Sequence, residues 1–288
     1  MRILLDAKDL INIVELRRPM STAEFARWME QRGAVLVLSL TSVSDFVGPV
    51  FSRRGDWLQM RSWLQTLESL PVVYIREGSI IRDELSEALR AYQVPQEPSP
   101  ANPYVPRWDE TAYWEGGAAT KILVGLRLDE IVYMARGAIQ AYKRYTRGLQ
   151  SKLAWERSLP PSKRQPLRDI FVNNLPDRLR AYKIDPAGVP LPKFGSWLWN
   201  SPLRCPGLRF QFEVYHQLRR DETMRLQEGD IADFAHLAAV PYVHVATVDK
   251  RIADLATKAS KKLGRNDTRA DFSGKLFKNV DEILSRFS

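Results

Sequence analysis

Short runs rich in aliphatic residues recur at both ends of the chain, and each is followed by a stretch with helical patterning. The runs occupy residues 2–6, 34–40, 71–75 and 242–247. Runs of this length are typical of strands that are buried on both faces of a sheet. Strands that alternate with helices indicate a parallel sheet covered by helices. The sequence therefore predicts an α/β protein whose parallel sheet is sandwiched by helices.

The middle of the chain differs from the two ends. Five prolines lie between residues 94 and 108, which excludes a helix or a central strand there. Residues 117–157 are patterned as a helix, whereas residues 188–206 are rich in proline and are predicted to be irregular. We therefore expect one α/β domain that is built from both ends of the chain and interrupted by a mainly helical insertion. The predicted parts are residues 1–77, the insertion 78–205, and residues 206–288.

The chain carries a formal net charge of +9, and this charge is unevenly distributed. Eleven basic and three acidic residues lie between Lys143 and Lys183, and nine basic and three acidic residues lie between Lys250 and Lys278. A basic surface near acidic residues is expected where a polyanion approaches a carboxylate site. Charge alone, however, favours the simpler interpretation of a solvated basic face without a partner.

Cysteine and histidine are scarce. The single Cys205 excludes an intramolecular disulfide, and three histidines disfavour a zinc site built from Cys or His. No apolar stretch is long enough to cross a bilayer, and the apolar start of the chain meets Asp6 too early for a secretory signal. The sequence therefore predicts a cytoplasmic protein with no membrane partner. Any bound metal is expected to be a hard cation held by carboxylate oxygens.

Five acidic residues stand where the predicted sheet would place a ligand. Asp6 ends the first strand, Asp45 follows the second, and Asp249 ends the last. Asp230 and Asp233 open the helix that precedes this last strand. Because ligands of an open parallel sheet bind at the carboxyl ends of its strands, we expect these five carboxylates to share one cleft as catalytic groups.

A cluster of carboxylates has a simple chemical consequence. The carboxylates repel one another, so at neutral pH they need a cation or must take up protons. Mg²⁺ or Mn²⁺ meets this need, and such a site activates water against a phosphodiester. The predicted metal ligands are Asp6, Asp230, Asp233 and Asp249. A structural interpretation also stays open, in which Asp230 and Asp249 cap helices and Asp45 stabilises the first turn of a helix.

Basic residues near the acids and in the insertion are predicted to bind phosphate. Lys250 and Arg251 directly follow the last acid and are expected to hold a nucleic-acid backbone. In the insertion, Lys143, Arg144 and Arg147 alternate with tyrosines, as on a surface that binds a single strand. An amphipathic helix with tyrosine in the core is the slightly favoured alternative for this second pattern.

Two segments carry a resemblance to a known family. One is Ile3-Leu4-Leu5-Asp6, and the other begins at Asp230 and ends at Arg251: Asp-Ile-Ala-Asp-Phe-Ala-His-Leu-Ala-Ala-Val-Pro-Tyr-Val-His-Val-Ala-Thr-Val-Asp-Lys-Arg. Together they resemble PIN-like nucleases. More narrowly, the Asp-x-x-Asp helix start, His-Leu, Pro-Tyr and final Asp before basic residues resemble a bacterial group of large PIN-like proteins. The likeness is one of motifs and covers about the first 75 and last 80 residues.

The resemblance implies a parallel sheet between helices, and cleavage of single-stranded RNA or DNA with Mg²⁺ or Mn²⁺. Asp6 and Asp249 match the first and last acids of the family, and Asp45 takes the second place, which is usually Glu. Either Asp230 or Asp233 matches the third acid. The resemblance does not cover the insertion, so the substrate preferences of the family transfer poorly to this chain.

These observations lead to two functional hypotheses. The first is a metal-dependent endonuclease that cleaves phosphodiester bonds, in single-stranded RNA in preference to DNA. The alternative is a catalytically silent protein of the same fold that binds nucleic acid or acts like a toxin–antitoxin component. The resemblance then implies an antitoxin or another protein regulator as a partner, and homodimers are common among PIN-like proteins. A phosphatase or nucleotide hydrolase is disfavoured, because the chain has no Gly-rich Walker loop.

Overall fold

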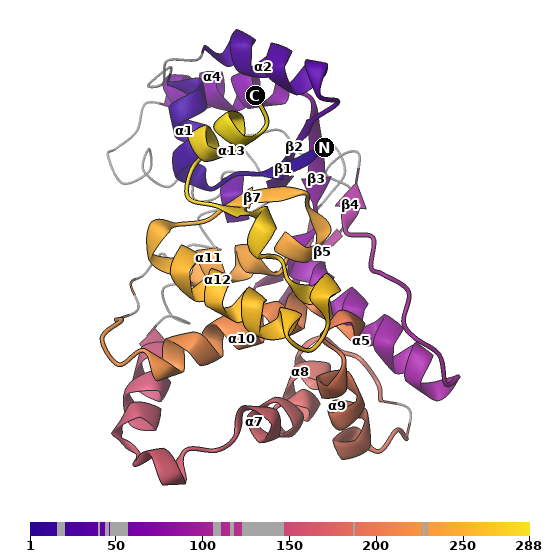
Figure 1. Cartoon of the computed structure of the whole chain (residues 1–288). Coiled ribbons are helices and arrows are strands. Elements are labelled where there is room, and N and C mark those ends of the chain that lie inside the picture. The colour runs from indigo at the N-terminus through magenta and orange to yellow at the C-terminus, as the bar shows by residue number, and fades with distance from the viewer. Residues whose placement is uncertain are drawn as a thin grey trace.

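A mostly parallel sheet of six strands runs through the middle of the molecule (Figure 1). The computed structural model describes residues 1–15, 21–39, 41–43, 46, 57–105, 111–115, 118–122, 147–186, 188–225, 227 and 230–288. The strands, in their spatial order, are β4 (Tyr104–Val105), β3 (Val72–Ile75), β2 (Val35–Ser39), β1 (Arg2–Leu4), β7 (Val245–Thr247) and β8 (Leu276–Phe277). All neighbours are parallel except β3 and β4. The expected parallel sheet is therefore confirmed.

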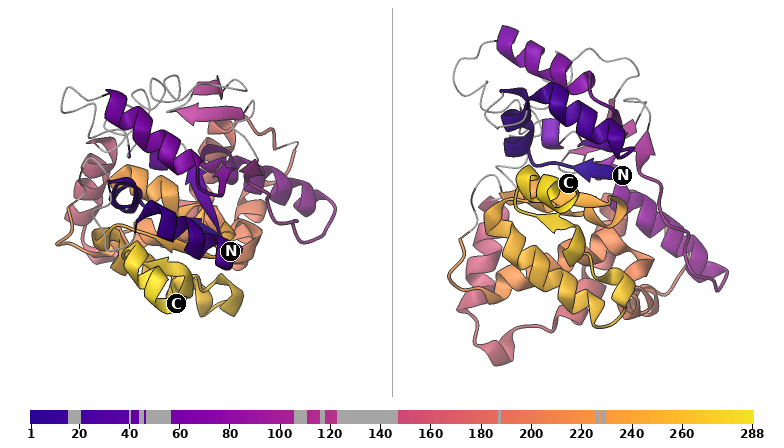
Figure 2. Two further views of the ribbon diagram at one scale, coloured as in Figure 1. Left: turned by 90° about the horizontal axis from the view of Figure 1, so that it is seen from above. Right: turned by 45° about the horizontal axis from the view of Figure 1, so that its top comes forward.

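The strands are buried on both faces, as their aliphatic composition predicts. Successive side chains of a strand point to opposite faces. Accordingly, Ile3 and Leu36 contribute to one hydrophobic cluster, and Leu4 and Val37 contribute to a second. Two layers of helices complete these clusters, so the sheet is the middle layer of three (Figure 2).

The first layer of helices is formed by both ends of the chain. It comprises α1 (Ala7–Val14), α2 (Thr22–Gln31), α4 (Trp57–Glu68) and α13 (Val280–Arg286). Helix α2 begins with a capping box, in which the Ser21 hydroxyl accepts from the Glu24 backbone N–H and the Glu24 carboxylate accepts from the Ser21 backbone N–H. The two chain ends therefore lie together on one face of the sheet.

The second layer contains the remaining helices. They are α5 (Glu77–Gln93), α7 (Leu167–Asn173), α8 (Leu175–Ala181), α9 (Leu191–Asn200), α10 (Pro206–Arg220), α11 (Asp230–Leu237) and α12 (Lys250–Gly264). Residues 147–158 are also helical. Leu153, Phe171 and Phe194 belong to the same buried cluster as Leu4 of the sheet. The helices of the predicted insertion thus extend the core of one sheet face.

Short elements connect these layers. Five 3₁₀ helices are described: η1 (Pro161–Lys163), η2 (Pro202–Arg204), η3 (Val240–Tyr242), η4 (Thr268–Ala270) and η5 (Ser273–Lys275). A separate two-stranded antiparallel sheet pairs β5 (Thr111–Glu115) with β6 (Ala118–Ile122). Within the described residues, no helix has both the length and the apolar composition that a bilayer crossing requires.

Two expectations about the insertion were wrong. The helix expected over residues 117–157 was wrong at its start, where residues 118–122 form strand β6, whose β-branched residues favour extended backbone. Residues 147–157 are helical as expected, and residues 123–146 lie outside the described residues. Residues 188–206, expected to be irregular, contain the ten-residue helix α9. Pro192 stands in the first turn of this helix, where a missing N–H breaks no hydrogen bond. Proline content alone therefore misjudged this segment.

A buried carboxylate joins three parts of the second helix layer. Glu84 of α5 is 3 % exposed and accepts hydrogen bonds from the backbone N–H groups of Gly207 (2.6 Å) and Leu208 (3.0 Å) in the first turn of α10. The Tyr242 hydroxyl also donates to Glu84, over 2.5 Å. Glu84 thereby satisfies N–H groups that a helix cannot satisfy itself.

Candidate active site

The strand order creates one edge where residues from distant parts of the chain meet. From β1 the chain moves to β2 and β3 on one side, and it returns much later to β7 on the other side. The point between β1 and β7 is therefore the topological switch point of the sheet, where open α/β folds bind ligands. Asp6 follows β1, and Asp249 follows β7 at the same edge.

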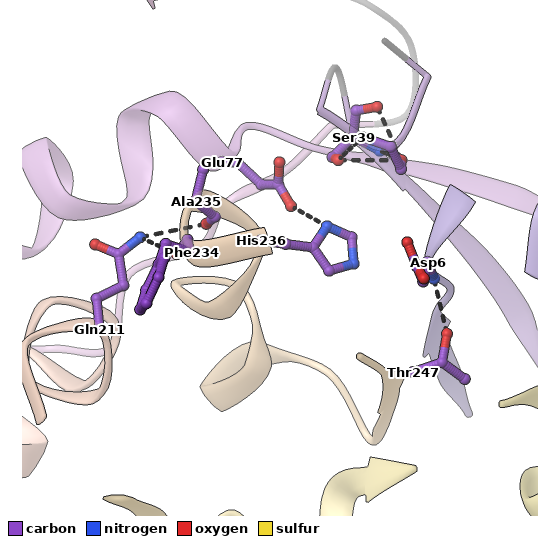
Figure 3. Close-up of polar contacts among 9 residues, drawn as sticks. Asp6, Ser39, Glu77, Gln211, Phe234, Ala235, His236 and Thr247 are labelled. Carbon is purple, nitrogen blue, oxygen red and sulfur yellow. Dashed lines mark hydrogen bonds and ion pairs between the residues drawn. The ribbon is translucent and has the colours of Figure 1, made fainter. Parts of the chain in front are cut away.

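Asp6 is anchored at this edge by its backbone. It stands at the N-cap position of α1, yet its side chain makes no capping hydrogen bond. Its backbone N–H instead donates to Oγ1 of the fully buried Thr247 over 2.7 Å (Figure 3). This contact joins residues from the two ends of the chain. The Asp6 carboxylate itself does not cap α1.

Asp249 caps the following helix. Its carboxylate accepts a hydrogen bond from the backbone N–H of Arg251 over 2.7 Å, so the capping interpretation is confirmed for this residue. Its negative charge also reaches Asp6. Burial raises the pKa of Asp6 above its ordinary value, and the charge of Asp249 raises it further, although His236 acts in the opposite direction. The two acids from opposite ends of the chain therefore share one electrostatic environment.

Among the predicted acids that the structure describes, Asp230 has the least exposed surface. It is 3 % exposed, accepts from the backbone N–H of Gln227 over 2.6 Å, and lies 3.1 Å from the Arg251 guanidinium. Burial raises the pKa of Asp230, whereas these two partners lower it. Arg251 also donates to the carbonyl of Arg225 over 2.6 Å. The guanidinium that we expected to bind phosphate is thus held by partners within the protein.

Asp233 and His236 lie on α11, one turn apart. His236 is buried, and its Nδ1 lies 2.9 Å from a carboxylate oxygen of Glu77, the first residue of α5. Figure 3 shows the imidazole between Glu77 and Asp6. Burial by itself lowers the pKa of His236, but Glu77, Asp6 and Asp233 together outweigh it, and the pKa is raised. These acids therefore favour the protonated form of the imidazole.

Two polar atoms of this pair are buried without a hydrogen-bond partner among the described residues. They are Nε2 of His236 and Oε2 of Glu77. Buried polar atoms are usually satisfied, and an exception points to a missing water, ion or ligand. The backbone of α11 is fixed meanwhile by Gln211, whose amide donates to the carbonyl of Phe234 over 2.7 Å.

The end of β2 adds buried hydroxyl groups to the same edge. The backbone N–H of Ser39 donates to Oγ of Ser42 over 2.9 Å, and the N–H of Ser42 donates back to Oγ of Ser39 over 2.9 Å. Both side chains are almost completely buried. This reciprocal pair fixes the turn by which the chain leaves β2. Asp45, predicted as the second acid, lies outside the described residues.

The structure thus unites some of the predicted residues and leaves others apart. Asp6 and Asp249 lie close enough for their charges to interact, and Asp249 acts likewise on Asp230. Lys250 is exposed directly after Asp249. Arg147 is exposed on the helical residues 147–158, and no described contact ties it to the carboxyl edge. Lys143 and Arg144 lie outside the described residues.

Sequence reasoning did not predict Glu77 or His236 as members of this edge. The signal for Glu77 was present, because it stands two residues after the predicted strand 71–75, in the position that Asp6 occupies after β1. No sequence signal identifies their pairing, since His236 lies 159 residues further along the chain and meets Glu77 only through folding.

The donor atoms of this edge suit a hard cation by their chemistry. Carboxylate and hydroxyl oxygens are the ligands that Mg²⁺ and Mn²⁺ prefer. In the part of the chain that the structure describes, however, no three acidic, histidine or cysteine side chains are grouped as a metal site. Comparisons of the chain with models of protein families, with curated proteins and with solved structures find no match.

Proposed function

We propose that the protein is a metal-dependent endonuclease of PIN-like fold, which cleaves phosphodiester bonds in single-stranded RNA in preference to DNA. One observation carries the proposal: Asp6 and Asp249, from opposite ends of the chain, share one charge environment at the switch point of a parallel sheet. Carboxylates that act on one another at a ligand-binding edge favour a bound cation. The basic surroundings of the edge favour a polyanionic substrate.

Asp6, Asp249 and an acid of α11 are the residues that would hold Mg²⁺ or Mn²⁺. Asp230 and Asp233 both stay candidates on α11, because both already interact within the protein: Asp230 with Arg251 and the backbone of Gln227, and Asp233 with the charge of His236. Asp45 remains a candidate outside the described residues. When bound, the metal would lower the pKa of a water molecule and polarise the phosphate.

The protein groups around these acids have positioning roles in this proposal. Thr247 holds the backbone of Asp6 at the end of β1. The ion pair between Arg251 and Asp230 fixes the start of α11 against the start of α12. Lys250 is exposed beside Asp249 and supplies the positive charge that orients a phosphate at the edge.

One structural feature favours the alternative of a catalytically silent protein. Two basic side chains, His236 and Arg251, already pair with the carboxylates Glu77 and Asp230. Acids that are neutralised within the protein need no metal. Thermal stability in Mn²⁺ distinguishes the two functions, because only a protein that binds the metal is stabilised by it. A ligand that binds only the folded protein stabilises it by about 1.4 kcal/mol at ten times its dissociation constant.

Cleavage assays test the proposal directly. Wild type, Asp6→Asn and Asp249→Asn would be incubated with labelled single-stranded RNA and DNA, with Mn²⁺ and then with EDTA. Asn is also a good N-cap, so Asp249→Asn keeps the start of α12. Asp169→Asn is the control, because Asp169 is an exposed acid of α7 with no described contact to the candidate site.

We expect cleavage of RNA by wild type and by the control, and its loss with EDTA. In both site variants the rate should fall by at least about a hundredfold, as for the loss of a group that stabilises the transition state. Absence of cleavage in wild type, together with no thermal stabilisation by Mn²⁺, would reject the nuclease and favour the silent alternative.

A further inference from the structure

Helix α12 begins at the candidate active site and exposes one line of side chains to solvent. Its first residue directly follows the capping Asp249, and its apolar side is buried against the second helix layer. The residues at spacings of three and four along the exposed side lie on one face of a helix. This face, called the α12 stripe here, consists of Lys250, Asp254, Lys258, Lys261 and Arg265.

The stripe is strongly basic, and its cations are not engaged in ion pairs among the described residues. Four of its five residues are basic, and all five are exposed. Among the described residues, none of these four cations forms an ion pair, whereas the flanking Arg251 and Lys262 pair with Asp230 and Glu213. The cations of this helix that form ion pairs thus flank the stripe, and the cations of the stripe are exposed to solvent.

The acids nearest the stripe are already engaged. Asp221 at the end of α10 accepts hydrogen bonds from Thr223 and Met224, and Asp271 accepts from Ser260 and Ser273. Lys258 and Lys261 add to the effects that lower the pKa of these two carboxyls, after the larger effect of the hydrogen bonds. Neither acid is within ion-pair distance of the stripe among the described contacts.

A neighbouring helix extends the positive surface. Helices α10 and α12 pack against each other (Figure 1), and α10 ends with the exposed Arg220. Burial lowers the pKa of His216 to about 4, and the charges of Lys262, Arg219 and Arg220 contribute to this shift. The exposed Arg220 therefore adds a cation at the end of α10, near Lys262 of α12.

The dimensions of the stripe suit a polymer. A helix rises about 1.5 Å per residue, so Lys250 and Arg265 lie about 22 Å apart along the axis, which is the length of several nucleotides. A membrane is a poor occupant, because the apolar side of α12 is buried in the core and the exposed side carries charge. A flexible polyanion matches an extended line of cations.

We propose that the α12 stripe binds the sugar–phosphate backbone of single-stranded RNA on one side of the cleavage site. The inference rests on the proposed nuclease function, since it deepens that function by assigning the surface that holds the substrate. Lys250 brings the strand to the acidic edge, and the remaining cations bind phosphates successively further from it. Substrate length therefore determines affinity through a surface that lies outside the catalytic acids.

The test compares two variants of equal charge change. In the stripe variant, Lys258→Gln, Lys261→Gln and Arg265→Gln are combined. The control variant combines Lys163→Gln, Lys183→Gln and Lys193→Gln, which are exposed lysines of η1, of the residues after α8 and of α9. Binding of a fluorescein-labelled single-stranded RNA twelve-mer is measured by anisotropy in EDTA, over a series of salt concentrations, so that binding is separated from cleavage.

We expect the stripe variant to lose affinity by about a hundredfold at 0.1 M salt and to show a salt slope that is smaller by about 2, because each lost phosphate contact removes about 0.7 from the slope. The control should bind like wild type. Equal losses in both variants, or equally strong competition by polyglutamate and RNA, would overturn the assignment of this surface to RNA.

Cleavage with Mn²⁺ then separates the two proposals. On the twelve-mer, the stripe variant should show a raised KM with kcat unchanged, and on a dinucleotide it should match wild type. RNA binding through the stripe without any cleavage would confirm the surface and reject the nuclease. Cleavage by wild type with unaltered binding and KM in the stripe variant would keep the nuclease and reject the surface.

Discussion

The buried carboxyl of Glu84 makes the stability of the protein depend on pH. Burial raises the pKa of Glu84 from 4.5 to about 7, although hydrogen bonds from Tyr242, Leu208 and Gly207 oppose the shift. Between pH 4.5 and about pH 7, Glu84 holds a proton in the folded protein that it has released in the unfolded chain. The stabilisation from this proton is present at low pH and is lost as the pH rises through about 7.

The magnitude follows from the two pKa values. Between pH 5 and pH 8, a shift from 4.5 to about 7 lowers the free energy of unfolding by about 2.5 kcal/mol. Glu84→Gln removes the titration, because its amide stays neutral throughout. The stability of wild type relative to Glu84→Gln should therefore fall by about that amount over this range.

Urea denaturation of both proteins at pH 5 and pH 8 measures this difference. Glu87→Gln is the matched control on the same helix, where hydrogen bonding to Arg90 lowers the pKa of Glu87 instead. Its effect should have the opposite sign and should lie at lower pH, because stability from a lowered pKa is lost as the pH falls. A wild-type to Glu84→Gln difference that stays constant, or that grows with pH, would refute the reasoning.

Two further predictions concern the candidate site. Thr247→Val removes the oxygen that accepts from the Asp6 N–H, and the unpaired donor should cost about 1–3 kcal/mol in urea denaturation, whereas Thr247→Ser should restore most of it; equal stability of all three proteins would contradict this role. Glu77→Gln should lower the pKa of His236, because burial remains and a main opposing charge is gone. Proton NMR resolves this titration among only three histidines, and an unchanged His236 pKa would show that Glu77 is not its partner.

Most of the sheet could be predicted from the sequence, because the signal is local. The runs at residues 34–40 and 71–75 became β2 and β3, and Asp249 caps α12 as one of its two interpretations required. The residue ranges that misled the prediction were 117–157 and 188–206. In the first range, the helical periodicity hid the strand preference of the β-branched residues in β6. In the second range, proline content suggested irregular backbone, although the first turn of a helix tolerates proline.

Only part of the candidate site could be predicted from the sequence. The rule that ligands bind at carboxyl strand ends located Asp6 and Asp249, and the structure brings these two acids within reach of each other's charge. The strand-end rule did not predict that Arg251 would pair with Asp230 instead of a phosphate. A buried carboxylate without a partner is costly, so Asp230 pairs with Arg251, and only the folded chain brings these two residues together.

The sequence by itself determined the α/β class, the two halves of the sheet and the positions of Asp6 and Asp249 at strand ends, because these follow from short-range periodicity and composition. Only the tertiary structure decided that β7 inserts beside β1, that Thr247 holds Asp6, and that His236 stands between Glu77 and Asp6. The physical reason is that such pairs are separated by more than 150 residues. Their contacts arise from the packing of whole layers, which no local pattern encodes.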